Sequence, residues 1–324
     1  MADELELLRR ANPVPSADPR FHERPLDQHA ERRLNHLLHS ARPRPWRRWV
    51  WSAGTAAAVG MVVLALTLSG STTTPAVAAP RALVVEAGSA PVPLDRLADR
   101  AAASDSSLPL LQGTHVQTWS LGMTSGPEAR PPITLPEERV VRWKSDGSHT
   151  ELVVATDPRH PGRPVITDAG PVPRTVEDGH VLSRQTYPPS WSDAPPQARP
   201  PHDAERLRAY LEEIDPIEAM DTPQLLDAVA QLLDHWTLGA RETAALTRVL
   251  ADAKGLRPAG AVTDRLGRQG QAYVYDDKAH SGRRMLILDP ATGAVLGLED
   301  TVTKADPEFG VKAGDVMSYR AWMR

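Results

Sequence analysis

Cysteine is absent from the 324 residues of this chain. Its absence excludes a disulfide framework, a zinc site built on thiolates and a cysteine nucleophile. Two further catalytic signatures are missing. The sequence has no Gly-x-Ser-x-Gly motif, which would place a serine nucleophile on a strained turn. The segment 267–270 contains two glycines but lacks the lysine and the strand-to-helix context of a phosphate-binding loop.

Paired acidic or metal-binding side chains are also scarce. Glu137 and Glu138 are adjacent on a predicted strand, so their carboxylates would point to opposite faces and would not form an acid/base pair. His36 and His39 could share a metal ion from one helix, but no other ligand completes a site at the usual spacing. We therefore expect no catalytic residue, no cofactor, no metal site and no enzymatic activity.

An excess of positive charge is lacking as well. Residues 1–48 hold ten Lys and Arg against seven Asp and Glu, a net charge of +3, whereas the rest of the chain holds 27 against 34, a net charge of −7. Nucleic-acid binding calls for a strongly basic face. We therefore expect no direct contact with nucleic acid.

One long segment, residues 49–70, has no charged side chain. A helix of this length is about 33 Å long and can cross a hydrocarbon core of about 30 Å. Basic residues precede it, and the next one after it is Arg81, so the positive-inside rule places the N-terminus in the cytoplasm and the C-terminal part outside the plasma membrane. The residues expected at the membrane interface are Arg44, Trp46, Arg47, Arg48, Trp49 and Trp51.

Two other kinds of segment share this apolar character. A helix buried in a soluble core could be equally apolar, although the border of arginine and tryptophan favours a membrane span. A cleaved signal peptide is suggested by the small residues at 76–78, but the 48 residues before the apolar segment are far more than the short basic region of such a signal. The sequence therefore favours an uncleaved signal anchor.

The head, residues 1–48, contains an amphipathic helix at 26–40. A second short helix is predicted at 3–11. Two short helices cannot bury enough surface to be stable alone, so the apolar stripe of the helix at 26–40 must pack against another surface. A cytoplasmic partner with a groove for a helix is the favoured one; the membrane surface, a second copy of the chain and a disordered head are the alternatives. The residues predicted to bind the partner are Leu26, Leu34, Leu37 and Leu38.

A linker at 71–80 leads to a predicted extracytoplasmic domain at 81–324. Its pattern runs from strands to helices and back to strands, which indicates an α+β fold: a single transmembrane helix is followed by an exported domain whose antiparallel sheet packs on helices. Helices are predicted at 94–103, after Asp203, after Asp221 or Thr222, and at 246–253. Strands are predicted at 115–123, 138–143, 149–155, 260–264, 271–275, 284–288, 294–300 and 316–322, with a further strand at 180–187 in a proline-rich stretch of loops. Turns are predicted at 145–147, between two of these strands, and at 289–293, where the pattern is Asp-Pro-x-x-Gly.

Four segments, 3–10, 139–147, 262–268 and 286–293, together with the arginine and tryptophan entry to the span, resemble an actinobacterial family of single-pass membrane proteins. Members of this family are commonly encoded beside an extracytoplasmic-function sigma factor. The resemblance implies an anti-sigma-like architecture: a cytoplasmic head for the sigma factor, one span and an outer sensory domain. The outer domain is similar to lipoprotein-carrier and sigma-regulator sensor domains, in which a curved antiparallel sheet partly encloses helices.

The resemblance predicts a membrane-anchored regulator of a sigma factor whose outer domain binds an envelope ligand or protein. This chain departs from the zinc-containing anti-sigma pattern because it has no cysteine, and its head is shorter than the usual anti-sigma domain. The alternative is an envelope lipid- or lipoprotein-binding protein that is held in place by its signal anchor.

Overall fold

The computed structural model describes residues 80–103, 108–124, 131–170, 172–189, 192–214 and 220–323. The chain divides into two compact units, Met1–Thr55 and Ala56–Arg324, and all described residues belong to the second. The predicted head, the span at 49–70 and their proposed partner-binding and interface residues lie outside the described residues. Within the described ranges, no helix has the length and apolar character needed to cross a bilayer.

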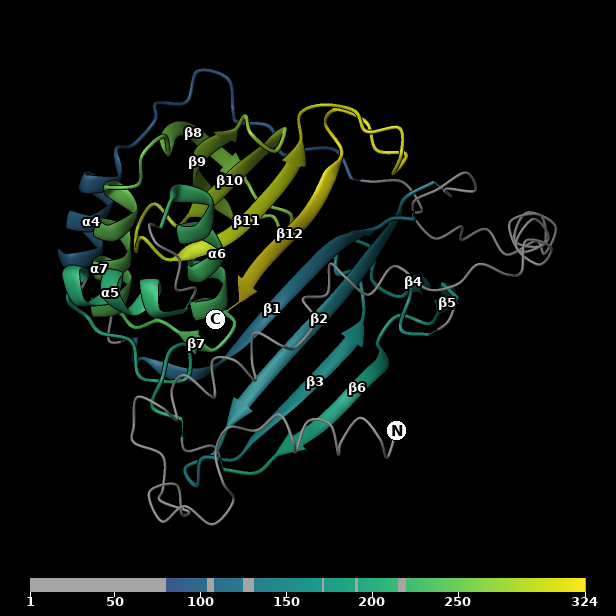
Figure 1. Cartoon of the computed structure of the whole chain (residues 1–324), viewed down its shortest axis with the longest axis horizontal. Helices are drawn as coiled ribbons and strands as arrows, with labels where there is room; N and C mark the ends of the chain where they lie inside the picture. The colour runs from purple at the N-terminus through teal and green to yellow at the C-terminus, as the bar shows by residue number, and fades with distance from the viewer. Residues whose placement is uncertain are drawn as a thin grey trace, which may run out of the picture. The chain divides into compact units, whose positions relative to one another are not determined.

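The second unit is built on one ten-stranded sheet in which every pair of neighbouring strands is antiparallel (Figure 1). The order across it is β6-β3-β2-β1-β12-β11-β10-β9-β8, and the short β7 pairs with the start of β1. A separate hairpin joins β4 to β5. The strands are β1 Leu111–Gly122, β2 Ile133–Trp143, β3 His149–Ala155, β4 Val165–Thr167, β5 Arg174–Val176, β6 His180–Tyr187, β7 Trp236–Thr237, β8 Arg257–Thr263, β9 Gln269–Asp277, β10 Gly282–Leu288, β11 Val295–Val302 and β12 Val316–Met323.

Four helices, α4 Leu94–Ala103, α5 Ala204–Ile214, α6 Thr222–Leu233 and α7 Ala240–Ala251, pack on one face of this sheet. The start of α6 has clear local causes. Asp221 accepts a hydrogen bond from the backbone N–H of Gln224, whose side chain accepts one from the backbone N–H of Asp221, and Pro223 lies in the first turn. The predicted capping of this helix by Asp221 is confirmed.

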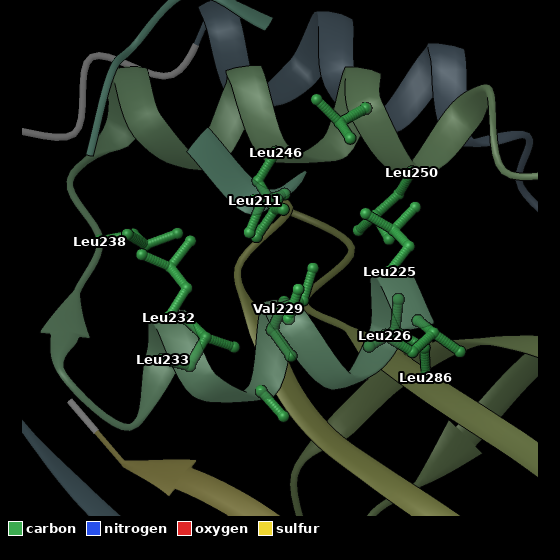
Figure 2. Close-up of a cluster of buried hydrophobic side chains, with 14 of the residues drawn as sticks. Leu211, Leu225, Leu226, Val229, Leu232, Leu233, Leu238, Leu246, Leu250 and Leu286 are labelled. Carbon is green, nitrogen blue, oxygen red and sulfur yellow. The ribbon is translucent and has the colours of Figure 1, made fainter. Parts of the chain in front are cut away.

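The apolar core between helices and sheet is formed largely by leucine side chains of α5, α6 and α7. Figure 2 shows them gathered between the helices, with Leu286 of β10 beside Leu226 at one edge of the cluster. Its strand residues come from β1, β7, β9, β10, β11 and β12; in the described part of the chain, it includes none from β2, β3 or β6. The helices therefore cover one half of the sheet, and Figure 1 shows β2, β3 and β6 extending beyond them.

A second apolar cluster lies on the opposite face of the same strands. Side chains alternate along a strand, so Tyr273 and Leu286 face the helices whereas Val274 and Met285 face away from them. The segment before α4 covers this second cluster with Ala82, Leu83 and Val85. The sheet is thus packed on both faces over its C-terminal strands.

The predicted α+β class with an antiparallel sheet packed on helices is confirmed, and α4 has the predicted bounds. Three details differ. The third helix of the series begins at Ala240, and β2 begins at Ile133. Pro136 has no backbone N–H to donate. It is tolerated in β2 because the last β2–β3 pair is Glu137 with Ala155, so the proline lies just beyond the pairing with β3. The stretch 157–201 contains not only the predicted strand β6 but also the β4–β5 hairpin, which the sequence did not indicate.

Candidate functional site

A row of three stacked rings crosses the half of the sheet that the helical core leaves out. Trp143 of β2 is directly paired with His149 of β3, which is directly paired with Tyr187 of β6. The ring centroids are 4.2 Å and 4.6 Å apart, and the ring planes are inclined by 21° and 13°. Stacking of this kind stabilises neighbouring strands beyond the area it buries. We call these three residues the aromatic row.

The aromatic row lies on the same face of the sheet as the helices. Arg139 is directly paired with Val116, a residue of the helical core, and Trp143 follows Arg139 by four positions on the same strand. Gly113 of β1 permits the close approach of β1 to β2 beside the aromatic row. A Cβ there would lie 2.5 Å from the carbonyl oxygen of Val141, and the φ angle of +124° favours glycine.

Paired charges lie beside the aromatic row. The Nε of Arg139 is 2.6 Å from Oε1 of Glu151, and its Nη1 donates to the backbone carbonyl of Asp234 at 3.3 Å. The carboxylate of Asp234 accepts from Nη1 of Arg320 at 3.2 Å and from Nε1 of Trp322 at 3.3 Å. Because Asp234 is the C-cap residue of α6, these bonds fix the end of that helix to the sheet.

Two histidines of the site have lowered pKa values. Burial lowers the pKa of His149, although the nearby Glu151 opposes the shift. Burial also lowers the pKa of His235, whose Nδ1 lies 2.9 Å from the carbonyl oxygen of Gln231. Among the described residues, neither Nδ1 of His149 nor Nε1 of Trp143 has a hydrogen-bond partner. The aromatic row thus has unused polar groups at its core.

Two carboxyl groups lie at the other end of β2. Burial raises the pKa of Glu137, and the negative charge of Asp168 adds to the shift; burial raises the pKa of Asp168 as well. Glu138 instead contacts His115. Adjacent residues of the strand therefore meet different neighbours, as the alternation of side chains requires.

The carboxylates of this face are held in ion pairs. Glu151 and Asp234 are each paired with an arginine, which fixes the orientation of the carboxylate. Within the described ranges, no group of three or more His, Asp and Glu residues could hold a metal ion. The aromatic row and the two ion pairs offer ring surface and fixed hydrogen-bonding groups.

A small hollow lies between the helices and the sheet. Its volume is about 20 Å³, and its lining includes Leu233, Trp236, Leu246 and Trp322. A space of that size holds about one water molecule.

Sequence reasoning did not find the aromatic row. Trp143 and His149 flank a predicted turn, so their pairing could have been inferred from the hairpin at 138–155. Tyr187 lies on a strand that joins β3 only after the β4–β5 hairpin, and no local pattern indicates that partner. The functional residues that the sequence did indicate lie outside the described residues.

The comparisons with known proteins do not assign this chain to a family. No family model and no curated protein matches the chain. Among solved structures, an inactive mutant of the CurK dehydratase matches at 12% identity with a TM-score of 0.13, covering 75% of this chain and 82% of that one. The dehydratase domain from the CurF module of curacin polyketide synthase matches at 14% identity with a TM-score of 0.12, covering 73% and 84%. TM-scores this low show no common fold.

Proposed function

We propose that this chain is a membrane-anchored regulator whose outer domain binds an envelope ligand on the half of the sheet formed by β2, β3 and β6. One observation carries the proposal. The helical core covers β9 to β12 and leaves the other half, where the aromatic row and the Arg139–Glu151 pair lie side by side. Partly exposed rings beside fixed polar groups are typical of a binding site.

The ligand class follows from the charges of this face. Arg139 and Arg320 are each paired with a carboxylate of the same face, so these ion pairs contribute little net charge with which to attract an ion. The rings offer flat apolar surface, and Gln185 lies next to Tyr187, which donates a hydrogen bond to it. A neutral, hydroxyl- or amide-rich ligand, such as a saccharide or a short peptide, fits this chemistry.

The alternative function, an envelope lipid carrier, receives less support. A carrier of this kind would hold an acyl chain between its helices and its sheet. In the described residues that space holds the leucine-rich core and a hollow of about 20 Å³, which has room for about one water molecule and not for an acyl chain. We therefore favour the regulator.

The intracellular half of the proposal rests on the resemblance described above. The head, residues 1–48, would engage an extracytoplasmic-function sigma factor through the leucine stripe at 26–38, and residues 49–70 would span the plasma membrane. A head of this size needs such a partner to cover its apolar stripe. The outer domain would then report the state of the envelope to the sigma factor.

A thermal-shift screen of the full chain in detergent micelles tests the binding face. Neutral saccharides and short peptides are the panel, and we expect at least one to raise the melting temperature of the wild type but not that of Tyr187→Ala. The matched control is Tyr275→Ala, which removes a tyrosine from β9 in the other half of the sheet and should keep the shift. A ligand that stabilises Tyr187→Ala as much as the wild type would contradict the assignment of this face.

A further inference from the structure

The segment 81–89, which we call the strap, crosses the face of the sheet that points away from the helices. Ala82, Leu83 and Val85 pack against the apolar cluster that includes Tyr319 and Ile287. The strap is the first described segment after the predicted anchor and linker.

One buried ion pair holds the start of the strap. Oε1 of Glu299 accepts a hydrogen bond from the backbone N–H of Leu83 at 2.8 Å, and its other oxygen pairs with Arg265. Arg265 also donates to the backbone carbonyl of Arg81 at 2.9 Å. The side chains of Arg265 and Glu299 are only 6% and 1% exposed. Both charges are thus buried under the strap and bonded to its backbone.

The end of the strap is held by β8, the last strand of the sheet. The backbone N–H of Glu86 donates to the carbonyl of Ala261 at 2.8 Å, and the N–H of Ala261 donates to Oγ of Ser89 at 2.9 Å. Gly260 permits this approach, because a Cβ at that position would lie 2.5 Å from Oγ of Ser89. The strap therefore satisfies backbone groups on an edge that would otherwise be open.

The polar groups under the strap are incompletely satisfied. Nε of Arg265 and the hydroxyl of Tyr319 are buried without a hydrogen-bond partner in the described part of the chain. Burial raises the pKa of Glu299 although Arg265 opposes the shift. Buried groups of this kind regain hydrogen bonds with water when their cover is removed. That gain offsets part of the cost of opening the strap.

We infer that the strap is a releasable latch, which opens by breaking its bonds to Glu299, Arg265 and Ala261 while the helices and the sheet stay folded. The helical core lies on the other face of the sheet, so opening the strap removes none of its contacts. Opening would uncover the apolar cluster and the edge of β8.

Adjacent residues of β12 connect the latch with the proposed binding face. Tyr319 lies in the cluster under the strap, with Arg265 stacked on its ring at 5.2 Å. The next residue, Arg320, points to the other face and pairs with Asp234 beside the aromatic row. A shift of β12 would move Tyr319 on one face of the sheet and Arg320 on the other. Only this link to the binding face rests on the proposed function; the latch itself does not.

Hydrogen exchange of the full chain in detergent micelles tests the latch with two neighbouring substitutions on β11. Glu299→Gln removes the charge that holds Arg265 and the strap. Asp300→Asn is the matched control, because Asp300 is also paired with an arginine but faces the helices, where its partner Arg284 contacts Asp227 of α6. We expect Glu299→Gln to speed exchange in peptides covering the strap by about tenfold or more, with α6, α7 and β10 unchanged. Asp300→Asn should leave the strap unchanged.

Two results together would contradict the latch: the strap exchanges at the same rate as β10 in the wild type, and the two substitutions accelerate both regions alike. The strap would then open only with the whole domain. Should Glu299→Gln fail to fold, Ser89→Ala removes one strap bond at an accessible position and must accelerate the strap alone. These readouts do not depend on membrane insertion or on a sigma factor. Failure of the latch is therefore distinguishable from failure of the proposed function.

Discussion

Arg139 of β2 donates a hydrogen bond to the backbone carbonyl of Asp234 at the end of α6, at 3.3 Å. This contact joins the half of the sheet that carries the aromatic row to the helical layer. The same guanidinium holds Glu151 at 2.6 Å, so one side chain both orders the binding face and fixes its position relative to the helices.

Replacement of Arg139 by Met should lower the free energy of unfolding by about 1–2 kcal/mol, because Glu151 keeps a partly buried charge without its partner. Urea denaturation measures the change. Arg208→Met is the control, since Arg208 pairs with Glu212 on an exposed helix surface and such pairs contribute about 0–0.5 kcal/mol. Equal losses in the two variants would show that the Arg139 pair has no special role.

The stability of the domain should fall on mild acidification. Burial lowers the pKa of His149 and of His235 below the usual value of 6.5, so the unfolded chain takes up protons there before the folded chain does. Their stabilising contribution is present above about pH 6.5 and is lost as the pH falls from there through the folded pKa values. We expect the pH dependence of unfolding between pH 7 and 5.5 to be weaker in His149→Phe.

An NMR titration of the His149 ring in the folded protein gives a second, direct measurement. A pKa for His149 at or above 6.5 in the folded protein would contradict the prediction.

Gly113→Ala should destabilise the domain by about 2 kcal/mol or more. The added Cβ would lie 2.5 Å from the carbonyl oxygen of Val141, and the φ angle of +124° is strained for alanine. Thermal unfolding is the measurement. Gly267→Ala is the comparison, because φ there is +79° but no atom lies within 4 Å of the added Cβ. If both variants lose the same stability, the close approach of β1 and β2 is not the cause.

The orientation of the predicted span can be tested through its arginines. Replacing Arg44, Arg47 and Arg48 by Gln should reduce the fraction of molecules with an external C-terminus, as measured with a topology reporter fused after Arg324. Arg81→Gln, on the other side of the predicted span, should not reduce it. A reporter that stays wholly external in the triple variant would show that these charges do not decide the orientation.

Local signals predicted the elements that depend on local contacts. The turn at 289–293 is an example: Gly293 adopts φ +72°, and the side chain of Asp289 accepts from the N–H of Ala291, as the Asp-Pro-x-x-Gly pattern indicates. The capping of α6 is another. In both cases the residues that determine the structure lie within five positions of each other.

The candidate site and the strap depend on contacts that no local pattern encodes. His149 and Tyr187 are joined by the pairing of β3 with β6, which are separated by the β4–β5 hairpin. Leu83 and Glu299 are 216 positions apart. The alternation of side chains in one sequence predicts which residues of a strand share a face of the sheet. It does not predict which strand lies beside it, because pairing and register depend on the packing of the whole sheet.

Co-purification of the full chain from membranes of the source organism tests whether the chain regulates a sigma factor. We expect one extracytoplasmic-function sigma factor to accompany the wild type and to be lost when Leu34 and Leu37 are both replaced by Asp. It should be retained in Asn35→Asp, which adds a charge to the opposite face of the predicted helix. Recovery of the chain from the membrane with no sigma factor, or with one that binds the double variant equally well, would contradict the regulator.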